Sequence, residues 1–158
     1  DMEVIKIIAK ASGDHGMVEG QMRDMLSEGK QLTIEELKAL HALKTGALIE
    51  AATRVGAILG NGSRVQIHQL ANYAEYIGLA FQVRDDILNV EGDPKVMGKS
   101  VGTDHDRQKN TFPTLLGLTE SKRFSEELVM GALQSLNEFD NKADPLRAIA
   151  RYIIDRKK

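Results

Sequence analysis

Two adjacent aspartates, Asp85 and Asp86, stand inside the otherwise apolar helical pattern of the segment FQVRDDILN. On a helix, residues three or four apart share a face, so Asp85 projects beside Phe81, Gln82 and Asn89, while Asp86 points about 100° away. Carboxylate and amide oxygens suit Mg²⁺, which commonly uses one or two carboxylates together with substrate phosphates. Two neighbouring acids also occur on solvated helix faces, so the pair alone does not establish a metal site.

The residues that follow the acidic pair have the chemistry that a diphosphate requires. Lys99 stands in the segment GKS, Asp104 in GTD and Lys109 in KNTFP. A divalent ion can bridge two phosphate oxygens while ammonium groups balance the remaining charge. Gly98 and Gly102 would let the backbone approach such a ligand closely. The sequence therefore predicts a Mg²⁺-dependent diphosphate site that combines these residues with Asp85.

A second basic candidate is Lys44, in the segment HALKTGALIEA. It stands among apolar residues, followed by Thr45 and by Gly46, whose small size permits close helix contact. A lysine in this setting can equally extend its stem along an apolar surface and keep its ammonium in water. Zinc is not favoured, because the chain has no cysteine and its four histidines show no metal-binding spacing.

These residues need helices to position them, and the sequence predicts an all-α fold. Only three prolines occur, and no segment alternates apolar and polar residues as a half-buried strand would. Thr33 and Glu36 have the spacing of a capping box. Long helices before and after the GNG turn are expected to pack antiparallel. We expect a helix that ends near residue 13, further helices over residues 17–28, 33–59, 64–90, 120–139 and 145–156, and a polar loop over residues 93–112.

Composition limits the functional classes. The chain has 158 residues, 42% of them hydrophobic, and a formal net charge of -2, values that favour one globular domain and neither nucleic-acid nor anionic-membrane binding. The absence of cysteine excludes disulfides and thiol catalysis, and a cytoplasmic location is expected. The chain contains no run of eighteen apolar residues, so neither a signal peptide nor a membrane span is predicted.

Several segments, taken together, resemble a known family. GLAFQVRDDILN followed by GDPKVMGKSVGTDHDRQKNTFPTLLGL resembles the second aspartate-rich region of the trans-polyprenyl diphosphate synthases, and LKTGALIEAA resembles their lysine–threonine helix. The resemblance is greatest to bacterial farnesyl diphosphate synthases (geranyltranstransferases). It implies an isoprenoid-synthase-type helical bundle around a central cavity. It also implies a Mg²⁺-dependent transferase that condenses an allylic diphosphate with isopentenyl diphosphate, and a homodimeric parent protein.

The resemblance implies a role for each matching residue. Asp85 would bind Mg²⁺, with Asp86 and Asp104 in support. Lys44 and Lys99 would hold the allylic diphosphate, and Lys109 would do so more weakly. Phe81 and Gln82 match an FQ pair at the cavity wall, Thr45 matches a threonine beside the reacting carbon, and Gln21 and Asp24 match a GQxxD helix that lines the pocket. The reacting groups implied are Lys44, Thr45, Gln82 and Lys99, while Gln21 and Asp24 could equally serve the fold.

The sequence departs from the family pattern in two ways. It lacks a first Asp-Asp-x-x-Asp motif and the basic site for isopentenyl diphosphate that precedes this region, and it begins at Asp1 within a helical pattern. Residues 1–158 therefore resemble the C-terminal portion of one polyprenyl synthase domain, which we do not expect to condense prenyl units alone. Asn89 stands where the second motif usually has an aspartate, so the metal affinity is expected to be lower.

Two other functional classes remain open from the sequence. The chain could be a non-catalytic helical subunit or interaction domain that depends on a partner for the first motif. It could also be another all-α Mg²⁺ enzyme that acts on diphosphates, such as a terpene cyclase or a nucleotide pyrophosphatase. The lysine motifs and the segment KNTFP favour the synthase over this last class.

Overall fold

The computed structural model describes residues 1–92 and 110–156, and every regular element in them is helical. The all-α prediction is thereby confirmed. The elements are α1 (Met2–Ser12), α2 (Met17–Leu26), α3 (Ile34–His41), the π-helical turn η1 (Ala42–Gly46), α4 (Ala47–Leu59), α5 (Arg64–Gly92), α7 (Phe112–Leu116), α8 (Leu118–Ser135), the short η3 (Asn141–Ala143) and α9 (Asp144–Asp155).

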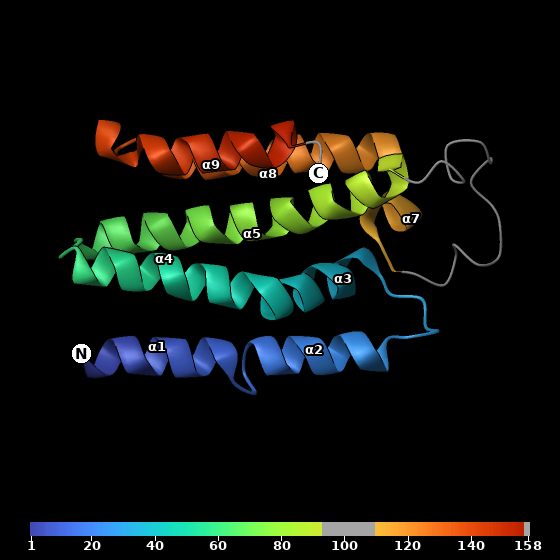
Figure 1. Ribbon diagram of the computed structural model, residues 1–158, viewed down its shortest axis with the longest axis horizontal. Coiled ribbons are helices and arrows are strands. Elements are labelled where there is room, and N and C mark those ends of the chain that lie inside the picture. The colour runs from blue at the N-terminus through green and yellow to red at the C-terminus, as the bar shows by residue number, and fades with distance from the viewer. Residues whose placement is uncertain (93–109, 157–158) are drawn as a thin grey trace.

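The long helix α5 is the centre of the molecule. Figure 1 shows α1 and α2 end to end in the lowest layer, then the row formed by α3, η1 and α4, then α5, and finally α8 and α9. Contacts join α5 to α4 on one side and to α8 and α9 on the other. Because α4 and α5 are joined by a short turn at residues 60–63, they run antiparallel, as the sequence predicts.

The core is built mainly from α5 and the helices above it. Tyr73, Val83 and Ile87 of α5 are fully buried, together with Phe112 of α7 and Leu136 after α8. The buried Tyr73 hydroxyl donates a hydrogen bond of 2.7 Å to the carbonyl oxygen of Leu146 in α9. A polar group in the core is thus satisfied, and the same bond fixes α9 against α5.

Most helix boundaries agree with the predictions made from capping signals. The predicted capping box before α3 is present: Thr33 N–H donates to Glu36 Oε2 at 2.8 Å, and Glu36 N–H donates to Thr33 Oγ1 at 3.2 Å. Helix α5 begins at Arg64 and extends to Gly92, close to the predicted range. The prediction of one α-helix over residues 33–59 is wrong in one detail, because the five-residue π-helical turn η1 divides it into α3 and α4.

The start of α7 shows a second difference from the predicted elements. This five-residue helix begins at Phe112, at the end of the predicted loop, and Thr111 caps it by accepting from Thr114 N–H. The side chain of Asn110 anchors the approach to α7, since its Oδ1 accepts from Leu32 N–H and its Nδ2 donates to Lys30 O, both at 2.8 Å. Within the described residues, none of the helices combines the length and the apolar character needed to cross a bilayer.

Candidate functional site

The turn η1 holds Lys44 and Thr45 between α2 and α5. A Cβ atom on Gly20 of α2 would lie 2.3 Å from Lys44 N and 2.5 Å from Lys44 Cα, so the backbones of α2 and η1 are in direct contact. On the other side, a Cβ atom on Gly78 of α5 would lie 3.3 Å from Gly46 Cα. π-Helical turns are rare and occur often at functional sites. Glycines on two neighbouring helices therefore fix the position of the lysine-bearing turn.

Lys44 is ion-paired within the protein. Its Nζ lies 2.5 Å from Asp24 Oδ2 on α2, and both side chains are partly exposed. The two residues were predicted at one pocket from separate motifs, and the structure brings them together. Because the pair is partly open to solvent, an incoming anion can reach the ammonium group without unfolding a helix.

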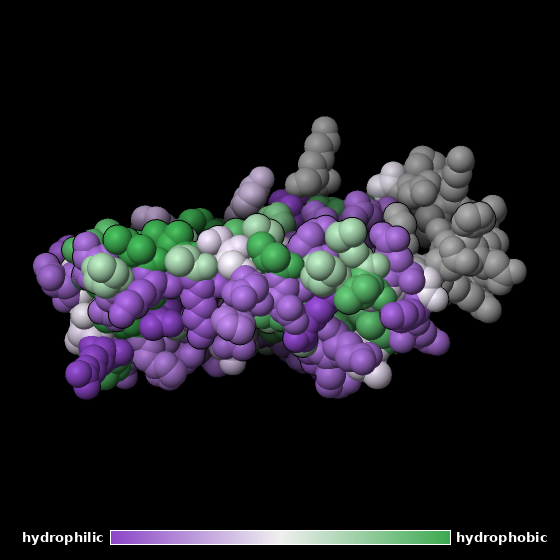
Figure 2. Space-filling view, turned by 90° about the horizontal axis from the view of Figure 1, so that it is seen from below, coloured by the Kyte–Doolittle hydropathy of each residue, from purple (hydrophilic) through white to green (hydrophobic). Residues whose placement is uncertain are grey.

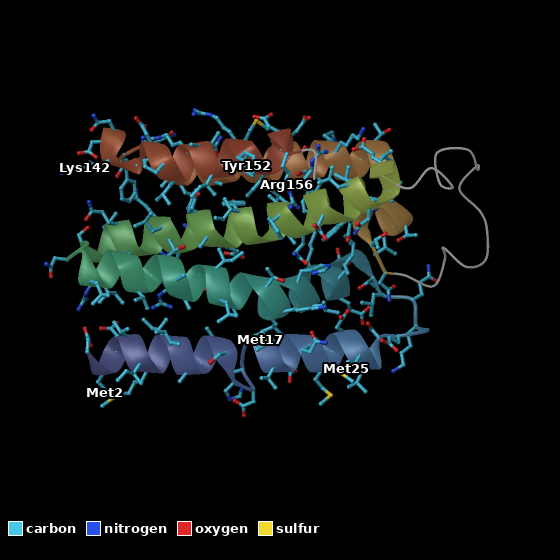
Figure 3. The ribbon with its side chains drawn as sticks, viewed as in Figure 1. Met2, Met17, Met25, Lys142, Tyr152 and Arg156 are labelled. Atoms are coloured by element: carbon cyan, nitrogen blue, oxygen red, sulfur yellow. The ribbon has the colours of Figure 1, made fainter. Side chains whose placement is uncertain are left out.

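Asp85 is also ion-paired, with a residue near the end of the described chain. Arg156 Nη2 lies 3.3 Å from Asp85 Oδ1 and donates a hydrogen bond of 3.1 Å to the carbonyl oxygen of Phe81. The guanidinium carbon lies 4.1 Å from the centre of the Phe81 ring, a cation–π geometry. The Asp85 side chain is 52% exposed, whereas that of Arg156 is 10% exposed. Figure 3 labels Arg156 and Tyr152 near the C-terminal end of α9.

Asp86 has a different role in this arrangement. Its Oδ2 accepts a hydrogen bond of 3.0 Å from Phe112 N–H, at the first residue of α7. Burial raises the pKa of Asp86 to about 6, opposed by the hydrogen bond from Phe112 and reinforced by the nearby charge of Asp85. The two aspartates diverge as the helix geometry predicts. In the structure Asp86 orients the start of α7, and its support of a metal ion stays a prediction.

His41 lies where the lysine side and the acidic side of the site meet. Its ring stacks on Phe112 with the ring centres 5.7 Å apart. Burial, and then the positive charge of Lys44, lower the pKa of His41, so the imidazole is neutral at physiological pH. The Gln82 side chain faces the ring and opposes this shift. Within the described residues, neither ring nitrogen makes a hydrogen bond of good geometry. His41, the last residue of α3, is therefore packed inside the site.

Residues of α4, α5 and α9 enclose an apolar groove of about 330 Å³. It is lined by Ile49, Ile77, Phe81, Ile149, Tyr152, Ile153 and Arg156. Arg156 and Phe81 belong both to this groove and to the surroundings of Asp85. A carboxylate that can bind a cation thus lies beside an apolar surface.

The other predicted residues fall into two groups. Gln21 is exposed on α2, Thr45 is partly buried in η1, and Gln82 is partly buried on α5. Lys99, Asp104 and Lys109 lie outside the described residues, so their placement beside Asp85 stays a prediction.

Asp85 offers a suitable but incomplete set of metal ligands. One of its oxygens already faces a cationic group, the Arg156 guanidinium, and its exposed side chain is accessible from solvent. In the part of the chain that the structure describes, no group of three or more His, Cys, Asp or Glu side chains gathers into a metal site. A Mg²⁺ ion held here would therefore depend on substrate phosphates and water for most of its ligands, which is usual for this ion.

Arg156, His41 and Arg84 are the site residues that sequence reasoning missed. Arg84 Nη2 donates a hydrogen bond of 3.0 Å to the Arg156 carbonyl oxygen, and so holds the end of α9 on α5. The segment RYIIDRKK contains a basic residue after an amphipathic helix, which was a signal for Arg156. The distance of 71 residues along the chain between Arg156 and Asp85 hid their contact.

The fold and the site define a class: an all-α bundle in which a lysine-bearing helix and an acidic helix lie side by side next to an apolar groove. Residues 1–151 match the model of the Polyprenyl synthetase family, and the chain belongs to this family.

Known proteins similar to the chain carry consistent names. It is 44% identical over 161 residues to the farnesyl diphosphate synthase of Haemophilus influenzae, an alignment that covers 99% of this chain and 53% of that protein. Curated relatives of comparable identity include geranylgeranyl diphosphate synthases. The chain spans 53% of the Haemophilus influenzae protein and between 41% and 52% of the length of these geranylgeranyl diphosphate synthases.

Solved structures share the fold. A putative farnesyl-diphosphate synthase from Marinomonas superposes with a TM-score of 0.83 at 39% identity, covering 98% of this chain and 52% of that one. A geranyltransferase from Helicobacter pylori, solved in complex with magnesium and isoprenyl diphosphate, superposes with a TM-score of 0.76 at 30% identity, covering 98% of this chain and 50% of that one.

Proposed function

We propose that the whole protein is a Mg²⁺-dependent prenyltransferase that condenses an allylic diphosphate with isopentenyl diphosphate into a short polyprenyl diphosphate, with farnesyl diphosphate as the leading product. One observation carries the proposal: Lys44 in η1 and Asp85 on the neighbouring helix α5 are each paired with an internal counter-ion, and the counter-ion of Asp85 lines an apolar groove. The names of the relatives and the magnesium and isoprenyl diphosphate in the Helicobacter pylori structure support the same chemistry.

The residues of the chain would divide the work between charge and shape. Asp85 would hold Mg²⁺, and the bound ion would neutralise the charge that develops on the leaving diphosphate. The Lys44 ammonium would bind the diphosphate directly as a compact positive charge. The Phe81 ring and the groove would keep water from the apolar chain of the substrate. Thr45 and Gln82 lie on the two helices that face this region, where polar side chains can orient the reacting carbon.

The remaining predicted residues keep their proposed roles. Lys99 and Lys109 would add positive charge around the diphosphate, and Asp86 and Asp104 would support the metal ion. Gln21 and Asp24 would line the pocket, with Asp24 acting through its ion pair with Lys44. The 158 residues contain no Asp-Asp-x-x-Asp motif, so we expect condensation only from the whole protein.

We also propose that the whole protein is a homodimer. Large apolar side chains are exposed on the outer face of α1 and α2, among them Met2 at 66%, Ile5 at 59% and Met25 at 60%. Figure 3 shows Met2 and Met25 pointing away from the bundle, and Figure 2 shows apolar patches between polar ones on this side. Analytical ultracentrifugation of the whole protein and of a Met25→Glu variant tests the assignment, because a charge inside the interface would shift the mass toward the monomer.

A cytoplasmic location is proposed as well, supported by the absence of cysteine.

Calorimetric titration with a non-ionisable allylic diphosphate analogue tests the proposed site. We expect Mg²⁺-dependent binding that Lys44→Ala and Asp85→Ala both abolish. Lys10→Ala is the matched control, because it removes the same charge from an exposed position on α1. Equal binding by all variants would refute the site. If the chain does not bind the analogue, the same variants are measured in the whole protein, where Asp85→Ala should remove most turnover without unfolding.

A further inference from the structure

Arg156 holds the position on Asp85 that a metal ion would need. Its side chain is 10% exposed, and its guanidinium lies 3.3 Å from Asp85 Oδ1 and stacks at 4.1 Å on the Phe81 ring. A guanidinium carries five N–H donors, which in a buried setting require acceptors. Here Nη2 reaches both Asp85 Oδ1 and the Phe81 carbonyl oxygen, while the buried Nε has no hydrogen-bond partner within the described residues. The cation is therefore held at this place with part of its hydrogen-bonding capacity unused.

We propose that Arg156 is a displaceable internal counter-ion of Asp85, so that a divalent cation binds this carboxylate only when the guanidinium moves away. The proposal rests on the proposed function, which assigns Asp85 to the metal. Two cations cannot both occupy the exposed Oδ1 side of one carboxylate at contact distance without strong mutual repulsion. Binding of the metal ion and the position of the Arg156 side chain are then linked, and each opposes the other.

The contacts around Arg156 separate the side chain from the backbone. Arg84 Nη2 holds the Arg156 carbonyl oxygen at 3.0 Å, and Arg84 Nη1 lies 3.8 Å from Glu91 Oε2. These contacts leave the end of α9 attached to α5 when the guanidinium is released. The movement therefore involves the side chain of Arg156 and not the unfolding of α9.

Release of the guanidinium has a second effect on the site. Arg156 lies over the Phe81 ring and lines the apolar groove of α4, α5 and α9. When the side chain leaves, one face of that ring and one end of the groove become accessible. The binding of a cation at Asp85 would thus expose apolar surface beside it, where the hydrocarbon part of a diphosphate substrate can pack.

Mn²⁺ titration of this chain, with free Mn²⁺ measured by electron paramagnetic resonance, tests the competition. Arg156→Gln removes the competing charge, and we expect it to bind Mn²⁺ about fivefold more tightly than the unmodified chain, the size of effect that a partly exposed ion pair produces. Arg151→Gln is the matched control, because it removes the same charge from an exposed position on the same helix. This control should change the affinity by less than about twofold.

Further variants separate the possible outcomes. Arg156→Lys keeps the charge but loses the planar fork and the stacking, so its Mn²⁺ affinity should fall between those of the unmodified chain and Arg156→Gln. Circular dichroism verifies that each variant is folded. Equal Mn²⁺ affinity of Arg156→Gln and the unmodified chain, with weaker binding by Asp85→Ala, would overturn the counter-ion role and leave the proposed function intact. Binding that Asp85→Ala does not weaken would instead refute the metal assignment. Absence of Mn²⁺ binding in every variant, Arg156→Gln included, would overturn the counter-ion role, because removal of the guanidinium would then not open Asp85 to a cation. The proposed function is judged separately, by the titration with the diphosphate analogue, because the ion at Asp85 depends on phosphate ligands.

A second readout follows the guanidinium itself. The Nε–Hε signal of Arg156, assigned by comparison with Arg156→Lys, should shift when Mg²⁺ is added and should take the same new position in Asp85→Ala without metal. A signal that responds neither to Mg²⁺ nor to Asp85→Ala would contradict release of the side chain.

Discussion

The close contact between Gly20 and η1 predicts a large effect from one methyl group. In Gly20→Ala, the new Cβ would lie 2.3 Å from Lys44 N, 2.5 Å from Lys44 Cα and 2.8 Å from Leu43 C. All three are backbone atoms inside a helix, so no side-chain rotation relieves the overlap. Overpacking of this kind typically costs about 3 kcal/mol at the upper end of its usual range. Alanine also favours the helix over glycine by about 1 kcal/mol, which leaves a net loss of about 2 kcal/mol.

Gly56 provides the matched control on α4. A Cβ there meets no atom within 4 Å, and the residue is exposed. Gly56→Ala should therefore raise the free energy of unfolding by about 1 kcal/mol, through helix propensity alone. The same substitution is thus expected to have opposite signs at two helix positions, with a difference of about 3 kcal/mol between the variants.

Urea unfolding followed by circular dichroism measures both variants. A difference of about 3 kcal/mol is well above the uncertainty of linear extrapolation. If the Gly20→Ala chain relaxes by moving α2 away from η1, the Lys44–Asp24 ion pair lengthens, and binding of inorganic pyrophosphate changes together with stability. Equal stabilisation by both alanines would refute the inference that α2 and η1 are in backbone contact.

Three further predictions concern charge and capping. Asp24→Asn removes the counter-ion of Lys44, so pyrophosphate should bind up to about fivefold more tightly, as measured by calorimetry. Weaker binding by Asp24→Asn would instead give Asp24 a direct role in the ligand site. Because the pKa of Asp86 is raised from 3.8 to about 6, the folded protein binds this proton more tightly than the unfolded chain does, so stability should fall as pH rises between about 4 and 6. Asp86→Asn should remove that part of the pH dependence and stabilise the protein at pH 7 by up to about 3 kcal/mol in urea unfolding, and an unchanged pH profile would contradict the shift. Thr33→Ala removes the capping box of α3 and should lower the thermal midpoint, at a cost of about 1 kcal/mol; a loss below about 0.3 kcal/mol would show that the cap is not used in solution.

Local signals made much of the fold predictable. A capping box marks α3, a glycine-containing turn separates α4 from α5, and buried residues recur along α5 from Tyr73 to Ile87. Each of these signals lies within a few residues of the feature that it determines. The start of α7 was available in the same way, because Thr111 and Pro113 are typical of a helix N-terminus, but a helix of five residues gives no apolar period to detect.

The interior of the site was less predictable, because its contacts join distant parts of the chain. The residue types and order around Lys44 and Asp85 indicated a cationic and a metal-binding position, and the structure places both residues on neighbouring helices. Their counter-ions could not be assigned: Asp24 lies 20 residues from Lys44, and Arg156 lies 71 residues from Asp85. The backbone of α2 lies against the π-helical turn at Gly20, a contact that apolar spacing within one helix does not reveal.

The turn η1 also determines how the two parts of its helical row are phased. A π-helical turn contains one more residue than an α-helical turn, and each residue adds about 100° of rotation. Leu37 and Leu40 before the turn and Ala51 and Ala57 after it are all buried. Deletion of one residue from Ala42–Gly46 would restore regular α-helix and rotate one pair away from the interior. A change in the length of Ala42–Gly46 would therefore require a compensating change nearby. A change in the length of the loop at residues 27–33 would leave the rotation of α4 relative to α3 unaltered.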